Sequence, residues 1–139
     1  GRDLLLRNFS KRPTSEEHGR INSFLDRVRM AAESDKPARF LSHGKRQWLE
    51  IGMLILSSPK LLLVDEPAAG LTDDETKLTA ELLLELQDAH SIIVIEHDMD
   101  FVRMLDSPVT VLNDGRIMAQ GTMKEIQSNE EVRKAYLGE

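Results

Sequence analysis

The 139-residue chain contains no cysteine, so disulfide bonds and thiolate metal sites are excluded. This absence is compatible with a reducing cytoplasm. Basic residues are in the minority, because the chain has 18 Lys and Arg compared with 24 Asp and Glu, which gives a net charge of -6. No segment concentrates positive charge. A surface that follows a phosphate backbone is therefore not expected, and nucleic acid is not a predicted partner.

Long hydrophobic runs are missing too. The longest strongly apolar stretch, residues 48–56, contains Glu50 and is far shorter than the about 20 residues that cross a membrane. Any membrane association is therefore expected to come through a partner. The chain opens with Gly1 and shows no signal-peptide pattern, from which we expect a truncated or processed polypeptide.

The N-terminal part predicts a helical region. Thr14 and Glu17 have the spacing of a capping box, which places a helix start just after Pro13. Apolar residues then recur at helical spacing over 21–32, with charged residues on the opposite face. The preceding segment 3–12 has an apolar cluster that fits either a short helix or a strand.

From residue 41 onward, helical and strand patterns alternate, which predicts an α/β fold with a parallel sheet flanked by helices. A helix over 44–57 is apolar nearly all round and is expected to be deeply buried. The short apolar runs 61–64 and 92–95 have the form of central parallel strands covered on both faces. A second capping box, Thr72 with Glu75, starts the helix between them.

The last third of the chain predicts an antiparallel hairpin and a helix. Asp114-Gly115, between the apolar segments 109–112 and 116–120, is a strong two-residue hairpin signal. Thr122 with Glu125 forms a third capping box, and a terminal helix is expected through 132–137.

Three groups of polar residues fall at junctions between these elements. The first, Ser42 to Gly44, lies where a loop becomes a helix, so backbone N–H groups and the helix dipole can attract phosphate oxygens. An ordinary serine N-cap would give the same pattern.

The second group, Asp65 and Glu66, ends an apolar strand, at the edge where ligands gather in open α/β sheets. Adjacent strand residues point to opposite sides, so the two carboxylates are expected to have different tasks. One can hold Mg²⁺, usually through water, while its neighbour orients the attacking water in phosphoryl transfer. Two solvated acids opening a turn at Pro67 would look the same.

The third group is His97, which follows Glu96 at the end of the second strand and precedes Asp98, a candidate helix cap. A histidine here can donate a hydrogen bond to a phosphoryl group, although a lone histidine in a turn is more often structural. No cluster of His with acids has metal-ligand spacing, and no Ser-His-Asp set stands out. No Gly-x-x-x-x-Gly-Lys-Ser/Thr loop occurs in the sequence, so the usual cradle for β- and γ-phosphates is absent from it.

Together these segments resemble the C-terminal part of an ATP-binding-cassette (ABC) transporter ATPase, over essentially the whole chain. Residues 42–44 match the signature motif, 61–66 match Walker B, 69–72 fall on the D-loop and His97 on the switch histidine. The likeness is greatest to urea and branched-chain amino acid importers, with a slight preference for urea from the stretch 47–53. The implied fold is part of a P-loop NTPase-type domain without its P-loop strand, with a partial helical sub-region over 1–40 and the ATPase core over 41–139.

The resemblance implies that two chains pair head to tail and share ATP. Asp65 would organise Mg²⁺ through water, Glu66 would act on the hydrolytic water, and His97 would contact the γ-phosphate. The signature residues that would clamp the ATP of the opposite subunit are Ser42, His43, Gly44 and Lys45. The D-loop would comprise Ala69, Gly70, Leu71 and Thr72. Three positions depart from the family pattern. His43 replaces the more general glycine, Lys45 stands where glutamine is usual, and Thr72 stands where aspartate is common.

ATP and Mg²⁺ are the implied cofactors of the complete domain. The implied partners are a second ABC ATPase subunit, identical or different, the transmembrane permease subunits and, indirectly, a solute-binding protein. The expected location is peripheral, at the cytoplasmic face of the inner (plasma) membrane. The chain alone is expected to bind ATP weakly or not at all and to be inactive, because it lacks the phosphate cradle.

Two other interpretations stay open. One is the C-terminal lobe of a chromosome-maintenance or repair ATPase, against which stand the acidic charge and the lack of sustained heptads over 1–40. The other is a non-catalytic regulatory module, which the intact acids and His97 disfavour. Because the family places its P-loop strand between the strand ending at His97 and the hairpin, we also expect the hairpin to rearrange or another chain to fill that gap.

Overall fold

The structure is a computed structural model that describes residues 13–136, so the undecided segment 3–12 and the residues after Tyr136 lie outside it. The chain forms two compact units, Gly1–Pro59 and Lys60–Glu139. The functional boundary expected near residue 40 stays a prediction. Over the range 13–136, no helix has both the length and the apolar character needed to cross a membrane.

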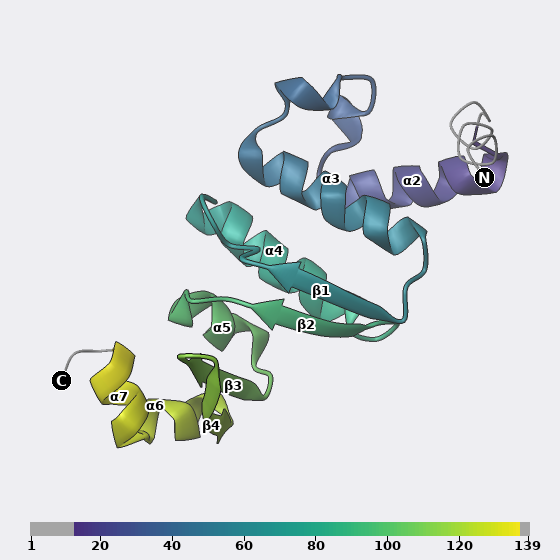
Figure 1. The fold of residues 1–139 in the computed structure, drawn as a ribbon. Coiled ribbons are helices and arrows are strands. Elements are labelled where there is room, and N and C mark those ends of the chain that lie inside the picture. Colours follow the sequence, from purple (N-terminus) through teal and green to yellow (C-terminus); the bar gives the residue numbers. More distant parts are fainter. Residues whose placement is uncertain (1–12, 137–139) are drawn as a thin grey trace. The chain divides into compact units, whose positions relative to one another are not determined.

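The first unit is helical (Figure 1). Helix α2 (Ser15–Arg27) leads through the short 3₁₀ helices η1 (Ala31–Glu33) and η2 (Ala38–Phe40) to helix α3 (His43–Leu56). The capping box that starts α2 is confirmed: Thr14 Oγ1 accepts from the Glu17 N–H at 3.2 Å, and Glu17 Oε2 accepts from the Thr14 N–H at 2.7 Å. The helix ends earlier than expected, because Arg29 adopts a left-handed turn with φ of 55°.

Helix α3 packs through one face. Its buried residues are Gly44, Trp48, Ile51 and Gly52. The contact with α2 is close at Gly52, where an added Cβ would lie 2.2 Å from a ring carbon of Phe24. Met53 and Leu54 are 58% and 50% exposed, so the expectation of a deeply buried helix is wrong. An apolar residue is buried only where a neighbour covers it, and the buried residues of α3 lie on one side.

The second unit begins with the predicted strand-helix-strand motif, which is confirmed. Strands β1 (Leu61–Asp65) and β2 (Ser91–Ile95) pair in parallel, so their carboxyl ends lie side by side (Figure 1). Helix α4 (Asp73–Leu86) connects them and starts at the predicted capping box. Helix α5 (Met99–Leu105) follows β2 and is capped by Asp98, as expected.

The core of this unit lies on one face of the β1–β2 sheet. It consists of Leu62, Val64, Ala80, Leu83 and Phe101. Residues on the other face are 50% to 64% exposed: Leu61, Leu63, Ile93 and Ile95. The expectation that both faces are covered is therefore wrong for the described residues, because α4 and α5 contribute to the same core on the same face.

The second unit ends in the predicted hairpin. Strands β3 (Val109–Asn113) and β4 (Arg116–Gly121) pair antiparallel, and Asp114 and Gly115 have positive φ of 48° and 72°. Both values suit a two-residue turn of this kind. Helices α6 (Met123–Ser128) and α7 (Glu130–Tyr136) follow, and the Tyr136 hydroxyl donates to the Leu112 carbonyl at 2.6 Å. The expected swap or rearrangement of the hairpin stays a prediction.

Candidate nucleotide site

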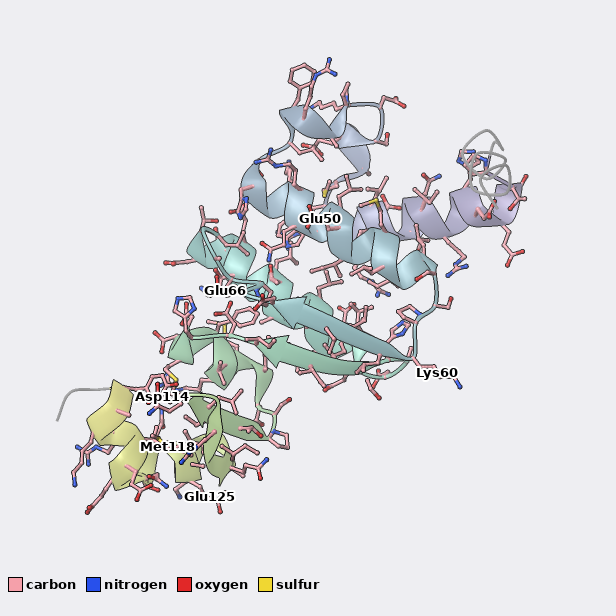
Figure 2. The ribbon with its side chains drawn as sticks, in the orientation of Figure 1. Glu50, Lys60, Glu66, Asp114, Met118 and Glu125 are labelled. Atoms are coloured by element: carbon pink, nitrogen blue, oxygen red, sulfur yellow. The ribbon has the colours of Figure 1, made fainter. Side chains whose placement is uncertain are left out.

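Glu66 and His97 lie together at the carboxyl ends of the two parallel strands. Glu66 follows directly after β1 (Figure 2), and its N–H donates to the Ile95 carbonyl at 2.8 Å, which ties it to the end of β2. Nδ1 of His97 lies 3.4 Å from Oε1 of Glu66, and the two side chains are 74% and 55% exposed. An acid and an imidazole this close, both open to solvent, can act on one water molecule or phosphoryl group.

The backbone at Glu66 differs from the expectation. Its φ is 46°, in the left-handed region, so the strand ends at Asp65 and the alternation of strand side chains does not reach Glu66. The argument that Asp65 and Glu66 point apart because they are neighbours in a strand is therefore wrong. A left-handed glutamate costs conformational energy, and such positions are found preferentially at functional sites.

Asp65 is an exposed carboxylate at the last position of β1. Within residues 13–136, no group of three or more potential ligands is arranged to hold a metal ion. Magnesium commonly keeps several waters and takes only one or two carboxylates together with substrate phosphates. An exposed strand-end aspartate next to Glu66 has the donor chemistry for such a magnesium ion.

A buried glutamate lies beside this pair. The Glu96 side chain is only 2% exposed, and its Oε2 lies 3.7 Å from Nδ1 of His97. Its carboxylate accepts hydrogen bonds from the backbone N–H groups of Ala68 at 2.8 Å, His97 at 2.9 Å and Asp98 at 3.2 Å. The carboxylate therefore connects the segment after β1 to the segment after β2.

Glu96 is not among the site residues predicted from the sequence, although its position in the strand pattern carries a signal. In β2, Ile92 and Val94 belong to the partly buried residues that pack on the core. Strand side chains alternate, so a residue two positions beyond Val94 is expected on the same covered side. A carboxylate on the covered side is stable only if hydrogen-bond donors replace its hydration, and the three backbone N–H groups are those donors.

The predicted D-loop forms the connection between β1 and α4. Gly70 has a positive φ of 69°, which suits glycine, and Ala69 donates its N–H to the Glu66 carbonyl at 3.1 Å. Thr72 is the N-cap of α4, where its Oγ1 accepts from the Glu75 N–H at 3.3 Å. The Thr72 hydroxyl therefore stabilises the helix start, and Leu71 completes the turn.

The predicted signature residues form the start of α3. Ser42 is the N-cap, and its Oγ accepts from the Lys45 N–H at 3.3 Å. Ser42 and His43 are exposed, whereas Gly44 is buried. The first N–H groups of a helix are not used by the helix itself, and together with the dipole they form an anion-binding end.

The Lys45 side chain has a partner within the same unit. Its Nζ forms an ion pair with Oε1 of Glu33, the last residue of η1, and the two side chains are 32% and 14% exposed. The hydrogen bond from Lys45 holds the pKa of the Glu33 carboxyl below its ordinary value of 4.5. A phosphate would therefore compete with Glu33 for the Lys45 ammonium.

This ion pair predicts a pH dependence of stability. A carboxyl whose folded-state pKa is depressed stabilises the fold above its unfolded-state pKa, and this contribution is lost as pH falls through the folded-state pKa. We expect Glu33→Gln to lower the urea midpoint of the chain at pH 7, and the difference from wild type to shrink below about pH 4. A constant difference between pH 7 and pH 3 would contradict this account. Glu50→Gln, an exposed position on α3, is the matched control.

Comparisons with known proteins indicate the family of this chain. A family model described as "ABC transporter" matches residues 3–69, and a model for the branched-chain amino acid ATP-binding cassette transporter matches residues 116–139. The chain belongs to the ABC transporter family. The predicted family is thereby confirmed.

Among curated relatives of this ABC chain is the branched-chain amino acid transport ATP-binding protein LivG of Escherichia coli. It is 38% identical over 138 residues, which cover 98% of this chain and 54% of LivG. BraF of Pseudomonas aeruginosa is 37% identical over 118 residues, covering 84% of this chain and 46% of BraF. The chain thus spans about half the length of the curated relatives it matches.

A solved structure supports the fold. MJ1267, an ATP-binding cassette of an ABC transporter in its ADP conformation, superposes with a TM-score of 0.79 and 28% identity, over 97% of this chain and 56% of MJ1267. The predicted α/β class, with a parallel sheet, flanking helices and a C-terminal hairpin, is confirmed for this ABC chain. The roles of individual site residues stay predictions.

Proposed function

We propose that this chain supplies the signature, Walker B, D-loop and switch-histidine part of the ATP-hydrolysing subunit of an ABC importer. The observation that carries the proposal is the approach of Glu66 Oε1 to His97 Nδ1, 3.4 Å apart at the carboxyl ends of two parallel strands. Glu66 orients and deprotonates the attacking water, and His97 donates a hydrogen bond to the γ-phosphate. Asp65 would hold Mg²⁺ through water, and the ion would neutralise charge on the phosphates.

The start of α3 acts in trans. Ser42, His43 and Gly44 clamp the ATP held by a second ATPase subunit, through helix N–H groups and the serine hydroxyl. Lys45 joins them only when it leaves Glu33, because its ammonium is engaged in that ion pair. ATP then joins two subunits, and hydrolysis separates them.

The proposed partners follow from this cycle. The opening and closing of the ATPase pair drives transmembrane permease subunits, to which a solute-binding protein delivers its cargo, and the ATPase sits at the cytoplasmic face of the inner membrane. The names of LivG and BraF support branched-chain amino acids as the solute. The stretch 47–53 favours urea, and the binding and permease subunits decide between them.

Alone, the chain is proposed to bind Mg-ATP weakly, because the sequence contains no Gly-x-x-x-x-Gly-Lys-Ser/Thr cradle. The function is tested in a LivG chimera, in which this chain replaces the segment of Escherichia coli LivG that it matches. We expect the chimera to hydrolyse Mg-ATP, while the 139-residue chain alone shows no saturable binding at micromolar ATP by calorimetry. A chimera that is folded by circular dichroism but does not hydrolyse ATP would refute the proposal.

A further inference from the structure

Glu96 is a buried carboxylate next to an exposed catalytic pair. Its side chain is 2% exposed, compared with 74% for His97. Burying a carboxylate costs several kcal/mol of hydration unless hydrogen-bond donors replace the lost water. Three backbone N–H groups do so here, and hydrogen bonds to a charged acceptor are among the stronger ones in proteins.

The two oxygens of this carboxylate serve different segments. Oε1 accepts from the N–H of Ala68, two residues beyond Glu66, at 2.8 Å. Oε2 accepts from the N–H groups of His97 and Asp98 at 2.9 and 3.2 Å. One side chain therefore bridges the segment that carries one catalytic group and the segment that carries the other.

We propose that Glu96 is a positioning residue that sets the distance between Glu66 and His97. The side chains of those two residues are 55% and 74% exposed, and the backbone segments that carry them contribute to setting their separation. The backbone hydrogen bond from Glu66 to Ile95 holds Glu66 at the end of the β1–β2 sheet. The hydrogen bonds of Glu96 then hold the segment after Glu66 against the segment that begins with His97. The effect on catalysis rests on the proposed function, whereas the bridge itself does not.

Two substitutions distinguish the loss of the hydrogen-bond bridge from the loss of the negative charge and from the loss of side-chain length. Glu96→Gln keeps the shape of the side chain but leaves only one acceptor oxygen, because the other oxygen is replaced by an NH₂ donor. The side chain can then accept from Ala68 or from His97 and Asp98, but not from both segments. Glu96→Asp keeps the charge but is one methylene shorter, so it can serve the nearby N–H groups of His97 and Asp98 and loses the reach to Ala68. Glu81→Gln, an exposed position on α4, is the matched control.

The bridge is measured in the 139-residue chain by amide hydrogen exchange. We expect the Ala68 N–H to exchange at least about 10-fold faster in Glu96→Asp than in wild type, with no change in Glu81→Gln. The His97 and Asp98 amides should keep their protection in Glu96→Asp. Unchanged protection at Ala68 in Glu96→Asp would overturn the proposal, and it does so whether or not ATP is ever hydrolysed.

The catalytic consequence is measured in the LivG chimera. Glu96→Asp and Glu96→Gln are expected to lower kcat about 10-fold to 100-fold with little change in KM for ATP, because small displacements of reacting groups are costly and Glu96 does not touch the nucleotide. A variant that loses thermal stability but keeps the wild-type kcat would show a structural role only and would overturn the positioning role. A wild-type chimera without activity would refute the proposed function, while the exchange experiment would still decide the bridge.

Discussion

Replacing Glu66 with glutamine should lower ATP hydrolysis by the LivG chimera at least about 100-fold while ATP binding is retained. Glutamine keeps the shape of the side chain but cannot accept a proton from water. The effect is expected to be large because, in the proposed function, Glu66 acts on the attacking water; its side chain is exposed, and its Oε1 lies 3.4 Å from Nδ1 of His97. Binding should persist because the phosphates are held by other groups.

Phosphate release under single-turnover conditions gives the chemical rate, and equilibrium binding of labelled ATP gives the affinity. The comparison is Glu81→Gln, which removes a carboxylate from an exposed position of the same unit. If Glu66→Gln reduced the rate less than about 10-fold, Glu66 would not be the group that acts on the attacking water. A loss of ATP binding together with the rate would instead indicate a role in holding the nucleotide.

Replacing Phe101 with alanine should destabilise the second unit by about 3–5 kcal/mol. Phe101 is 0% exposed and packs with Leu62, Val64, Ala80 and Leu83, so its removal leaves a cavity beneath the sheet that carries the site. A folded domain is stable by only about 5–15 kcal/mol, so this loss is a large fraction of the total. The strand ends that carry Glu66 and His97 would lose their support.

Urea unfolding followed by circular dichroism measures the effect. The midpoint for Phe101→Ala should fall by at least about 1 M, given the usual dependence of stability on urea. Phe40→Ala is the matched control, because Phe40 is 68% exposed. Its ring centroid lies 4.6 Å from Cζ of Arg39. The control should cost at most about 1 kcal/mol. Equal losses in the two variants would contradict the described core.

Local sequence patterns predicted much of this fold because their causes are local. The capping boxes at Thr14, Thr72 and Thr122 each mark a helix start, since two hydrogen bonds three residues apart suffice to form them. The turn at Asp114-Gly115 follows from the residues that tolerate positive φ. Parallel pairing of β1 and β2 follows from the strand-helix-strand order.

Burial was predicted less well, because it depends on neighbours that are distant in sequence. An apolar pattern marks the exposed Leu63 and the buried Leu62 alike, and only the position of α4 and α5 distinguishes them. The left-handed backbone at Glu66 has no signature in the residue type. The Lys45 side chain pairs with Glu33, 12 residues away along the chain, and Glu96 accepts from Ala68, 28 residues away, so both contacts lie beyond any local pattern.

The motifs predicted that the acids and His97 belong to one site, and the structure brings Glu66 and His97 together. The relation of Ser42 to that site stays a prediction, since the signature lies in the first unit and the pair lies in the second. The proposed cycle requires Ser42 to act on ATP that another subunit holds. This requirement distinguishes the proposed site, which two subunits share, from a site formed within a single chain.

Mixing two inactive chimeras tests the shared site directly. One carries Glu66→Gln and the other carries Ser42→Arg, which blocks the signature. If each ATP lies between the Glu66 side of one subunit and the signature of the other, a mixed dimer contains one intact site of its two. Half of randomly formed dimers are mixed, so the mixture should recover about a quarter of wild-type ATP hydrolysis. No recovery, from variants that still form mixed dimers, would contradict a site shared between subunits.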